Sequence, residues 1–417
     1  MPPAQAGAHI RLPAWLLVSI VAAIGFNLRA TLGAIPPLLD SIGEDLVLSA
    51  STAALLTSVP ILCMGLFAPV SQLVAARIGA EGTAAILLGV LAVSSLMRFW
   101  VGSIETLLFS TALAGIGMGG ISSLMPGLIF HHLPRIPGAA TGVYSMAMAG
   151  GVAIAAWIAG PTADLLGGWR PALALWGLAA GITTICWSAL LPRLSAAAPR
   201  DPVLQGVARG RLPWHSPTAR RITTFTTLNM LIGFSGVAWI APTFVHHGFS
   251  PQHAAGLFAL FQIIQLGAML SLPLLTDFTR DRRPLLALTV VSTGTGLSLM
   301  VLAPTTLALP AVMLFGTGVG GASSLALILI QDATSTQSEA GRLGAMVLSV
   351  SFLAGAAGPL LLGSMRDLTG GFTAGYGILL MLSVACLAML PVFRPGRTVN
   401  DVLPHTPPLP GIDTAGG

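Results

Sequence analysis

Long apolar stretches dominate the chain and recur at regular intervals. Each is close to the roughly 20 residues that an α-helix needs to cross a hydrocarbon core of about 30 Å. Turns of Gly, Pro and charged residues separate most of them. The pattern therefore predicts twelve membrane-spanning helices, near residues 13–38, 51–76, 83–101, 105–130, 138–162, 171–191, 221–245, 254–276, 284–303, 306–331, 342–364 and 373–393.

One stretch without helical periodicity divides these spans into two sets of six. It covers residues 193–219 and is rich in Pro, Gly and Arg. We expect an N-terminal six-helix bundle in residues 1–192, a cytoplasmic linker in 193–219 and a second six-helix bundle in 220–395. Residues 396–417, rich in Pro and Gly, are expected to form a disordered cytoplasmic tail.

The two sets of spans contain the same motifs. Gly115-Ile-Gly-Met-Gly-Gly-Ile-Ser-Ser-Leu124 returns about 200 residues later as Gly316-Thr-Gly-Val-Gly-Gly-Ala-Ser-Ser-Leu325, and Asp164-Leu-Leu-Gly-Gly-Trp169 returns as Asp367-Leu-Thr-Gly-Gly-Phe372. Because six spans per half is an even number, both copies enter the membrane in the same orientation. The chain is therefore predicted to be an all-α membrane protein built from two parallel six-helix repeats, an arrangement found in one large class of transporters.

Both glycine runs also match G-x-G-x-x-G, the fingerprint of dinucleotide binding. That fingerprint binds phosphates only where a strand turns into a helix and leaves backbone N–H groups free. Here the glycines lie inside long apolar stretches. They favour close packing between helices instead, and we expect no cofactor.

Composition and charge exclude a soluble protein. Only 8% of residues are charged and 54% are apolar, whereas a soluble domain carries roughly a quarter charged residues. The net charge of +5 comes from Arg alone, since the chain has no Lys, and the arginines sit in short loops without a basic face for nucleic acid. Three cysteines, Cys63, Cys186 and Cys386, lie far apart inside apolar segments and form no disulfide or metal pattern.

The arginines also orient the chain, because cytoplasmic loops retain positive charge. With the N-terminus inside, fifteen of the 19 basic residues fall in cytoplasmic segments, and Asp40, Glu44 and Asp45 fall outside. Only Arg29, Arg98, Arg170 and Arg366 remain in or beyond the membrane. The sequence therefore predicts a multi-pass protein of the bacterial plasma (inner) membrane with both termini in the cytoplasm.

Several motifs resemble one transporter family. The resemblance is carried by Asn27-Leu-Arg29, by Pro37-Leu-Leu, by the run from Leu55 to Pro69, and by Trp239-Ile-Ala-Pro242. Together they are similar to the cyanate permease and 2-nitroimidazole transporter family of the major facilitator superfamily, across residues 20 to 390. The resemblance implies the major facilitator fold and alternating access, with a small-molecule solute bound between the two bundles.

The same resemblance implies a gating motif on the cytoplasmic side, which follows roughly the pattern G-x-L-A-D-R-x-G-R-R. The first half keeps only Arg77 and Gly79 clearly. The second half keeps more of it, in Asp277, Arg282 and Arg283. If Asp–Arg contacts latch the inner gate, the copy in the second half is the better candidate for the latch.

Arg29 is the most informative single residue. It lies roughly 20 Å into the first span, and no Asp or Glu falls in the interior of any predicted span. An ionisable side chain at that depth is costly and marks a functional site. We favour a cation that attracts an anionic or strongly polar solute, with Asn27 beside it. The alternative is an Arg that bonds helix carbonyls or reaches outward to Asp40 or Glu44.

Other candidates come from the spans that line the cavity in the superfamily. Gln262 and Gln265 lie about one helical turn apart, and Tyr144 needs a partner for its hydroxyl. Each polar group could equally join helices to one another. The further substrate-binding candidates are Ser123, Asn229, Trp239 and Ser324.

Histidines and carboxylates complete the survey. His131-His132 at an inner helix end, and His246, His247 and His253 in an outer loop, could bind metal or sense pH, but their spacing matches no ligand set, and no metal site is predicted. No catalytic group set sits at membrane depth, so we do not expect an enzyme. The lack of buried carboxylates argues against a proton-driven efflux pump for hydrophobic compounds, and the lack of an output domain argues against a membrane sensor.

The sequence thus predicts a secondary active or facilitative transporter for a small polar or anionic solute. A cyanate-like anion or a nitroimidazole-like heteroaromatic is the class that the resemblance implies. Protons are one candidate for the coupling ion, and we expect the chain to act as a monomer in the lipid bilayer.

Overall fold

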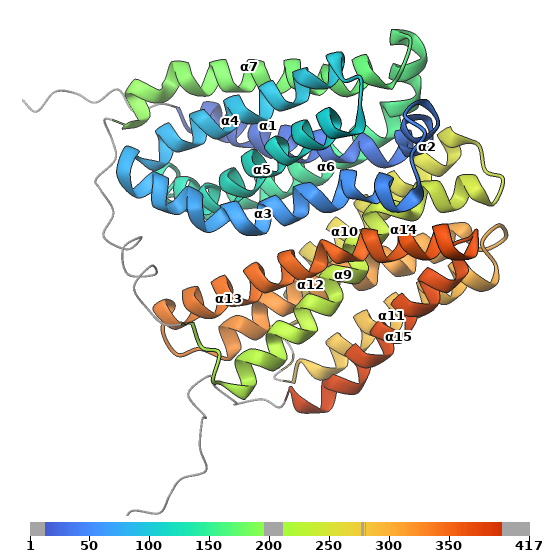
Figure 1. Ribbon diagram of the computed structural model, residues 1–417. Helices are drawn as coiled ribbons and strands as arrows, with labels where there is room; N and C mark the ends of the chain where they lie inside the picture. The colour runs from blue at the N-terminus through green and yellow to red at the C-terminus, as the bar shows by residue number, and fades with distance from the viewer. Residues whose placement is uncertain (1–12, 196–211, 277–278, 280, 394–417) are drawn as a thin grey trace, which may run out of the picture.

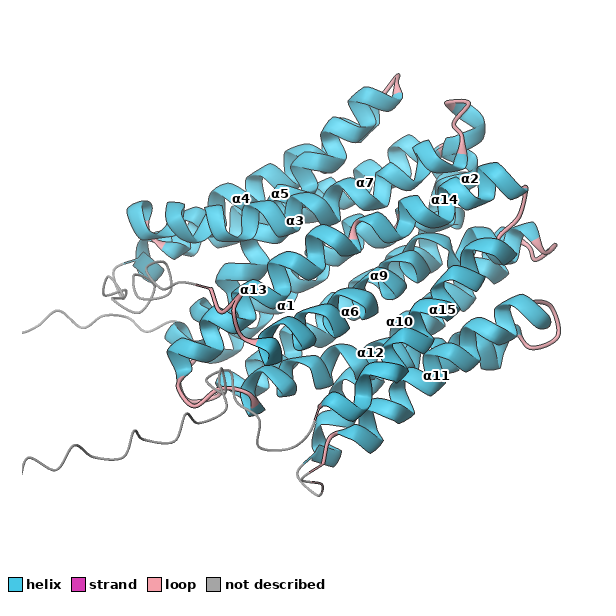
Figure 2. Cartoon of the chain, turned by 60° about the horizontal axis from the view of Figure 1, so that its bottom comes forward, coloured by secondary structure: helices cyan, strands magenta, loops and turns pink. Residues whose placement is uncertain are grey.

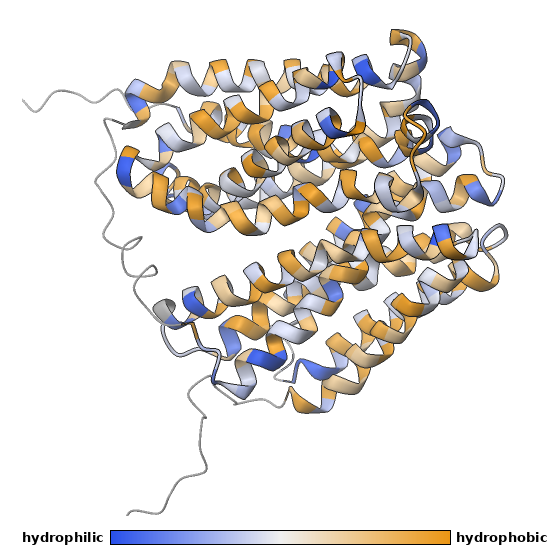
Figure 3. Cartoon of the chain, viewed as in Figure 1, coloured by the Kyte–Doolittle hydropathy of each residue, from blue (hydrophilic) through white to orange (hydrophobic). Residues whose placement is uncertain are grey.

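The computed structural model describes residues 13–195, 212–276, 279 and 281–393, and this part of the chain is helical throughout, without strands (Figure 2). The expected tail and most of the expected linker lie outside the described residues. Twelve helical segments are long and apolar enough to span a membrane, which confirms the predicted number. Orange, apolar residues cover most of their length in Figure 3, while the blue, polar residues gather toward helix ends.

The described part of the first half contains seven helices. They are α1 (Ala14–Gly33), α2 (Ile35–Asp45), α3 (Ala50–Ile78), α4 (Ala80–Met97), α5 (Ile104–His132), α6 (Pro137–Leu166) and α7 (Trp169–Ser195), with a 3₁₀ turn, η1 (Arg98–Trp100), after α4. α7 thus continues three residues into the segment that the sequence assigned to the linker.

The second half repeats this order. Its helices are α9 (Pro217–His246), α10 (Pro251–Thr276), α11 (Arg283–Leu302), α12 (Ala308–Asp332), α13 (Gln337–Gly355), α14 (Ala357–Thr369) and α15 (Thr373–Met389), followed by the 3₁₀ turn η2 (Leu390–Val392).

Two spans that the sequence predicts as continuous helices are broken. α1 stops at Gly33, just before Pro36 and Pro37, and resumes as α2. α13 stops at Gly355, just before Pro359, and resumes as α14. Proline has no backbone N–H to donate to the preceding turn, so a break at these points costs little.

The two halves form two bundles with matching internal contacts (Figure 1). In the first bundle α1 packs on α6, α3 on α5, and α4 on both α5 and α7. In the second bundle α9 packs on α13, α10 on α12, and α11 on both α12 and α15. These are the same pairs in sequence order, which confirms the parallel repeat. Across the seam α3 meets α13 and α14, and α6 meets α10.

The repeated glycine runs lie inside unbroken helices α5 and α12 and pack against their neighbours. A Cβ at Gly119 would sit 2.5 Å from the Cα of Met64 on α3, and one at Gly117 would sit 2.9 Å from the carbonyl oxygen of Leu87 on α4. In the second bundle, a Cβ at Gly320 would sit 2.1 Å from the carbonyl oxygen of Gln265 on α10. The glycines therefore serve close helix packing, as predicted.

A Cβ at Gly320 should consequently be destabilising. We expect Gly320→Ala to lower stability by about 1–3 kcal/mol, because α10 and α12 must separate to make room. Gly344→Ala on α13 is the matched control, since nothing lies within 4 Å of a Cβ there. It should be neutral or stabilising by up to about 1 kcal/mol. Thermal unfolding of both variants in one detergent measures the difference, and equal midpoints would contradict this account of the packing.

Candidate substrate site

We call the end of the molecule where α7 stops and α9 begins the linker end (Figure 1). The opposite end, which contains the turns at Asp45, Gly167, Gly248 and Gly370, is the distal end. Polar contacts join the two bundles at the distal end. At the distal end the carboxylate of Asp367 accepts hydrogen bonds from the backbone N–H groups of Ala50 and Ser51, each 2.8 Å long.

Two further contacts close the same end. Arg366 on α14 forms an ion pair with Asp40 on α2, with 3.7 Å between Nη1 and Oδ1. On the other side of the seam, the side-chain amide of Gln252 on α10 donates to the carbonyl oxygen of Trp157 on α6, at 3.2 Å. The bundles are thus held together at the distal end along both lines where they meet.

Arg29 lies on α1, half-buried, and interacts electrostatically with Tyr144 on α6. Within the described residues, no hydrogen bond or ion pair engages its guanidinium. Two of the partners that the alternative interpretation names belong to other arginines. Asp40 pairs with Arg366, and it is Arg98 that bonds a helix carbonyl, that of Thr31 at 3.0 Å. A charged group left unpaired at this depth favours the functional interpretation.

Tyr144 lies beside this arginine with an unused hydroxyl. Its side chain is only 7% exposed, and α6 approaches α1 so closely that a Cβ at Gly25 would sit 2.7 Å from the Tyr144 carbonyl oxygen. Ser122 on α5 is a hydrogen-bonding neighbour of the phenol, and Arg29 acts on it through its charge. Still, the hydroxyl has no hydrogen-bond partner of good geometry among the described residues. A buried hydroxyl without a partner is uncommon and suits a group that meets a ligand.

The candidate residues of the second bundle include three neutral amides. Asn229 on α9 donates to the hydroxyl of Ser323 on α12 at 2.9 Å. Gln262 on α10 is buried, and its Oε1 has no partner among the described residues. Gln265, one turn further on, is half-buried, and its backbone packs against the glycines of α12. The two bundles therefore differ in charge: the first offers a cation and the second offers amides.

Three other predicted residues join helices to one another, and a fourth, Ser324, bonds within its own helix. Asn27 donates to Thr183 of α7 at 2.9 Å, and the hydroxyl of Ser123 lies 2.8 Å from that of Ser71 on α3. Ser324 donates to the carbonyl oxygen of Gly321 on its own helix. Trp239 is fully buried and donates its indole N–H to the carbonyl oxygen of Pro359 at 2.9 Å.

In each serine doublet, the serine before the predicted one lies nearer to the other candidate residues. Ser122 and Ser323, the first serines of the two repeated motifs, are the ones that lie near Tyr144 and Asn229. One residue along a helix turns a side chain by about 100°. The repeated motif gave no way to choose between the two positions.

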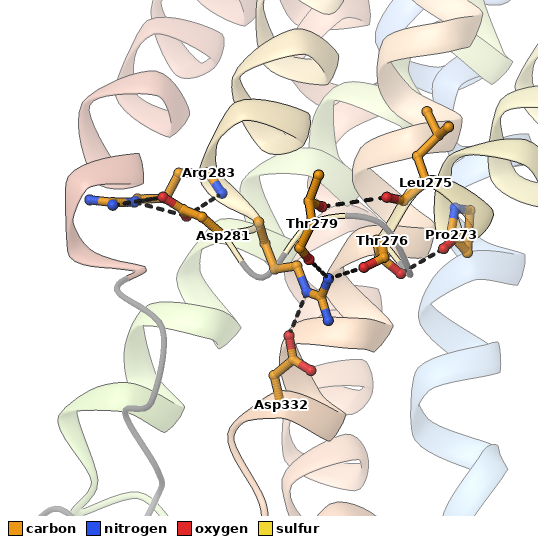
Figure 4. Close-up of polar contacts among 8 residues, drawn as sticks. Pro273, Leu275, Thr276, Thr279, Asp281, Arg283 and Asp332 are labelled. Carbon is orange, nitrogen blue, oxygen red and sulfur yellow. Dashed lines mark hydrogen bonds and ion pairs between the residues drawn. The ribbon is translucent and has the colours of Figure 1, made fainter.

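The predicted gating residues that the structure describes lie at the linker end. Arg77 is exposed, and Gly79 ends α3 with φ at 93°. Asp277 lies outside the described residues. Arg282 pairs with Asp332 at the end of α12, at 2.9 Å, and also donates to the carbonyl oxygens of Thr276 and Thr279 (Figure 4).

Arg283 has a separate, local partner. It pairs with Asp281 at 2.7 Å, and this guanidinium lowers the pKa of the Asp281 carboxyl. Neither arginine reaches the first bundle through these contacts. Asp332, which the sequence analysis did not single out, ties the loop between α10 and α11 to α12 within one bundle.

Comparison with known proteins gives a consistent picture. The family model of the Major Facilitator Superfamily matches residues 16–359. An uncharacterized transporter of Bacillus subtilis (strain 168) is 30% identical over 362 residues, covering 86% of this chain and 88% of the relative. The 2-nitroimidazole transporter of Escherichia coli (strain K12) is 28% identical over 90% of this chain and 93% of its own length. The cyanate transport protein of the same organism is 27% identical over 91% and 98%.

Solved structures share the fold at low identity. The xylose transporter of Escherichia coli in an inward open conformation matches with a TM-score of 0.75 at 14% identity, covering 94% of this chain and 99% of that one. A bacterial homolog of the human lysosomal transporter Spinster matches with a TM-score of 0.72 at 16% identity, covering 91% and 95%.

Proposed function

The chain belongs to the Major Facilitator Superfamily, and from that premise we propose that it carries a small polar or anionic solute across the bacterial plasma membrane by alternating access. The predicted family and fold are confirmed, and the relatives are transporters and not enzymes. The solute class and the mechanism of transport are what we propose beyond membrane transport itself.

The main support for the proposed solute class is Arg29. It is a cation at membrane depth without an ion-pair partner in the described part of the chain, next to the unused hydroxyl of Tyr144. An anion or a strongly polarised heterocycle would supply the missing acceptor. A cyanate-like anion or a nitroimidazole-like heteroaromatic fits this requirement, and two relatives are named for such solutes.

The closed distal end supports alternating access. Contacts of α14 with α2 and α3, and of α10 with α6, hold the two bundles together at that end through an ion pair and a few hydrogen bonds, beside a hydrophobic cluster that both bundles share. Such contacts can break and reform as the bundles rock about a midplane site. With both termini in the cytoplasm, as the arginine distribution favours, the distal end faces outward.

The rival is a proton antiporter for hydrophobic compounds. Such pumps commonly carry protons on a carboxylate inside the membrane. Among the described residues, the acidic side chains lie in loops or near helix ends: Asp40, Glu44, Asp45, Glu81, Glu105, Asp164, Asp281, Asp332, Glu339 and Asp367. A membrane sensor is the more distant rival. Protons are a candidate coupling ion for the solute, and we propose that the chain transports as a monomer.

Transport assays in proteoliposomes separate these functions. Purified chain is reconstituted, and uptake of labelled cyanate, of 2-nitroimidazole and of a hydrophobic cation is followed with and without a proton gradient. We expect saturable uptake of the anion or the heteroaromatic, each reducing uptake of the other if both bind at Arg29. Saturable transport of the hydrophobic cation alone, driven by the proton gradient, would establish the antiporter instead.

A further inference from the structure

A cluster of two histidines and a glutamate lies at the linker end of the first bundle. Glu81 stands in the first turn of α4, and His131 and His132 are the last two residues of α5. One ligand atom from each of the three side chains falls within 4.8 Å of the others. The histidines were noticed in the sequence, but Glu81, about 50 residues earlier, was not.

The surroundings hold this cluster in place. Gly79, at φ 93°, turns the chain so that α4 starts directly after α3. The carbonyl oxygen of Glu81 accepts a hydrogen bond from the indole N–H of Trp187 on α7, at 3.0 Å. Its carboxylate Oε1 lies 3.0 Å from Nε2 of His132. Glu81 is only 5% exposed, and a carboxylate so buried needs a cationic or donor partner.

The two imidazoles are placed to share that carboxylate. Their rings meet edge to face, with centroids 4.8 Å apart. Glu81 is buried, His132 is partly buried and His131 is exposed, so an incoming ion can reach the cluster from the side of His131. Two imidazole nitrogens and one carboxylate oxygen are the donor set that Zn²⁺ and related divalent ions take in catalytic and regulatory sites, with water completing the shell.

The second bundle joins the corresponding loop and helix end without such a donor set. There the loop before α11 is tied to the end of α12 by Arg282 and Asp332. A guanidinium does not give up its proton and cannot bind a metal. In the first bundle the corresponding tie, from the start of α4 to the end of α5, uses imidazoles, which become ligands when neutral.

We propose that Glu81, His131 and His132 form a binding site for a divalent transition metal ion, of which Zn²⁺ is the best match. The ion joins the start of α4 to the end of α5 at the linker end, apart from Arg29 and the solute. Ligand atoms in a tetrahedral zinc site lie roughly 3.3 Å apart. The 3.0 Å pair is already that close, and rotation of the exposed His131 ring closes the rest.

Zinc binding to the whole chain tests this proposal. Protein purified without a polyhistidine tag and treated with chelator is titrated with Zn²⁺ in detergent, and the metal retained after gel filtration is counted. We expect about one Zn²⁺ per chain, and Co²⁺ in its place should give the visible absorption of a low-symmetry site. His131→Gln keeps the Glu81–His132 contact and should fold, yet it should weaken binding at least tenfold.

A matched control is present at the distal end. His246 and His247 are also adjacent residues whose rings meet edge to face, at 5.4 Å between centroids. Nδ1 of His247 already contacts the carbonyl oxygen of Thr243 at 2.8 Å. Replacing both by Gln should leave zinc binding unchanged. If the wild-type chain retains no Zn²⁺, or if His131→Gln binds as tightly as wild type, the proposal is wrong.

Discussion

Replacement of Arg29 by Gln should reduce uptake of an anionic solute by roughly ten- to hundredfold. A hydrogen bond to a charged group contributes about 1.5–3 kcal/mol, and each 1.4 kcal/mol is about tenfold in affinity. The guanidinium is half-buried and has no ion pair among the described residues that it could fall back on. The loss should therefore appear as weaker solute binding, measured as a higher KM for uptake into proteoliposomes.

Two variants show whether the charge itself matters. Arg29→Lys keeps a cation but loses the planar fork, so it should retain part of the uptake. Arg170→Gln is the matched control, because Arg170 is also a membrane-proximal arginine but already pairs with Asp45 at 2.8 Å. It should leave the KM for the anion unchanged. Equal KM values for wild type and Arg29→Gln, in well-folded protein, would remove Arg29 from the site.

Replacement of Asp367 by Asn should shift the molecule toward opening at the distal end. The carboxylate accepts two hydrogen bonds from the first turn of α3, in the other bundle. A carboxylate at a helix N-terminus stabilises it by about 1 kcal/mol when exposed, which is roughly fivefold in a two-state equilibrium. Distance measurements between spin labels at Glu105 and Thr305, two exposed distal positions, should show a larger open population.

The internal repeat supplies the control for this variant. Asp164 occupies the position in the first half that Asp367 occupies in the second. It is exposed near the end of α6, a helix that packs on α10. The first turn of α10 begins with Pro251 and is capped by Ser250, whose hydroxyl lies 3.3 Å from the N–H of His253. That turn leaves little for Asp164 to bind. Asp164→Asn should leave the label distances unchanged, and an equal shift in both variants would contradict a latch at Asp367.

The overall architecture followed from the sequence because it depends on local patterns. Span length, loop charge and repeated motifs all act over a few neighbouring residues. The glycine runs illustrate this, since Gly119 and Gly320 pack as the pattern indicated. The broken first span was not foreseen, although Pro36 and Pro37 signalled it, because prolines within other spans, such as Pro242 in α9, leave the helix unbroken.

The site depends on contacts between distant segments, and these could be predicted less well from the sequence. Whether Trp239 lines a cavity or caps Pro359 depends on where α14 lies. The partner of Arg282 is 50 residues away, at Asp332. In the sequence, Glu81 cannot be distinguished from other acidic residues in loops, because only the packing of α5 places the two histidines beside it. Arg29 could be singled out because the cost of a charge in lipid needs no knowledge of its neighbours.

The glycine-lined contacts inside each bundle have a mechanical consequence. Backbones that touch without side chains between them leave no soft layer to compress, and a close-packed interior transmits strain with little loss. Each bundle should therefore act as a stiff lever arm. A displacement of a fraction of an ångström near Arg29 is then amplified over the length of α1 and α6 into a larger movement at the distal and linker ends. Solute binding should therefore move the ends of the bundles without deforming their interiors.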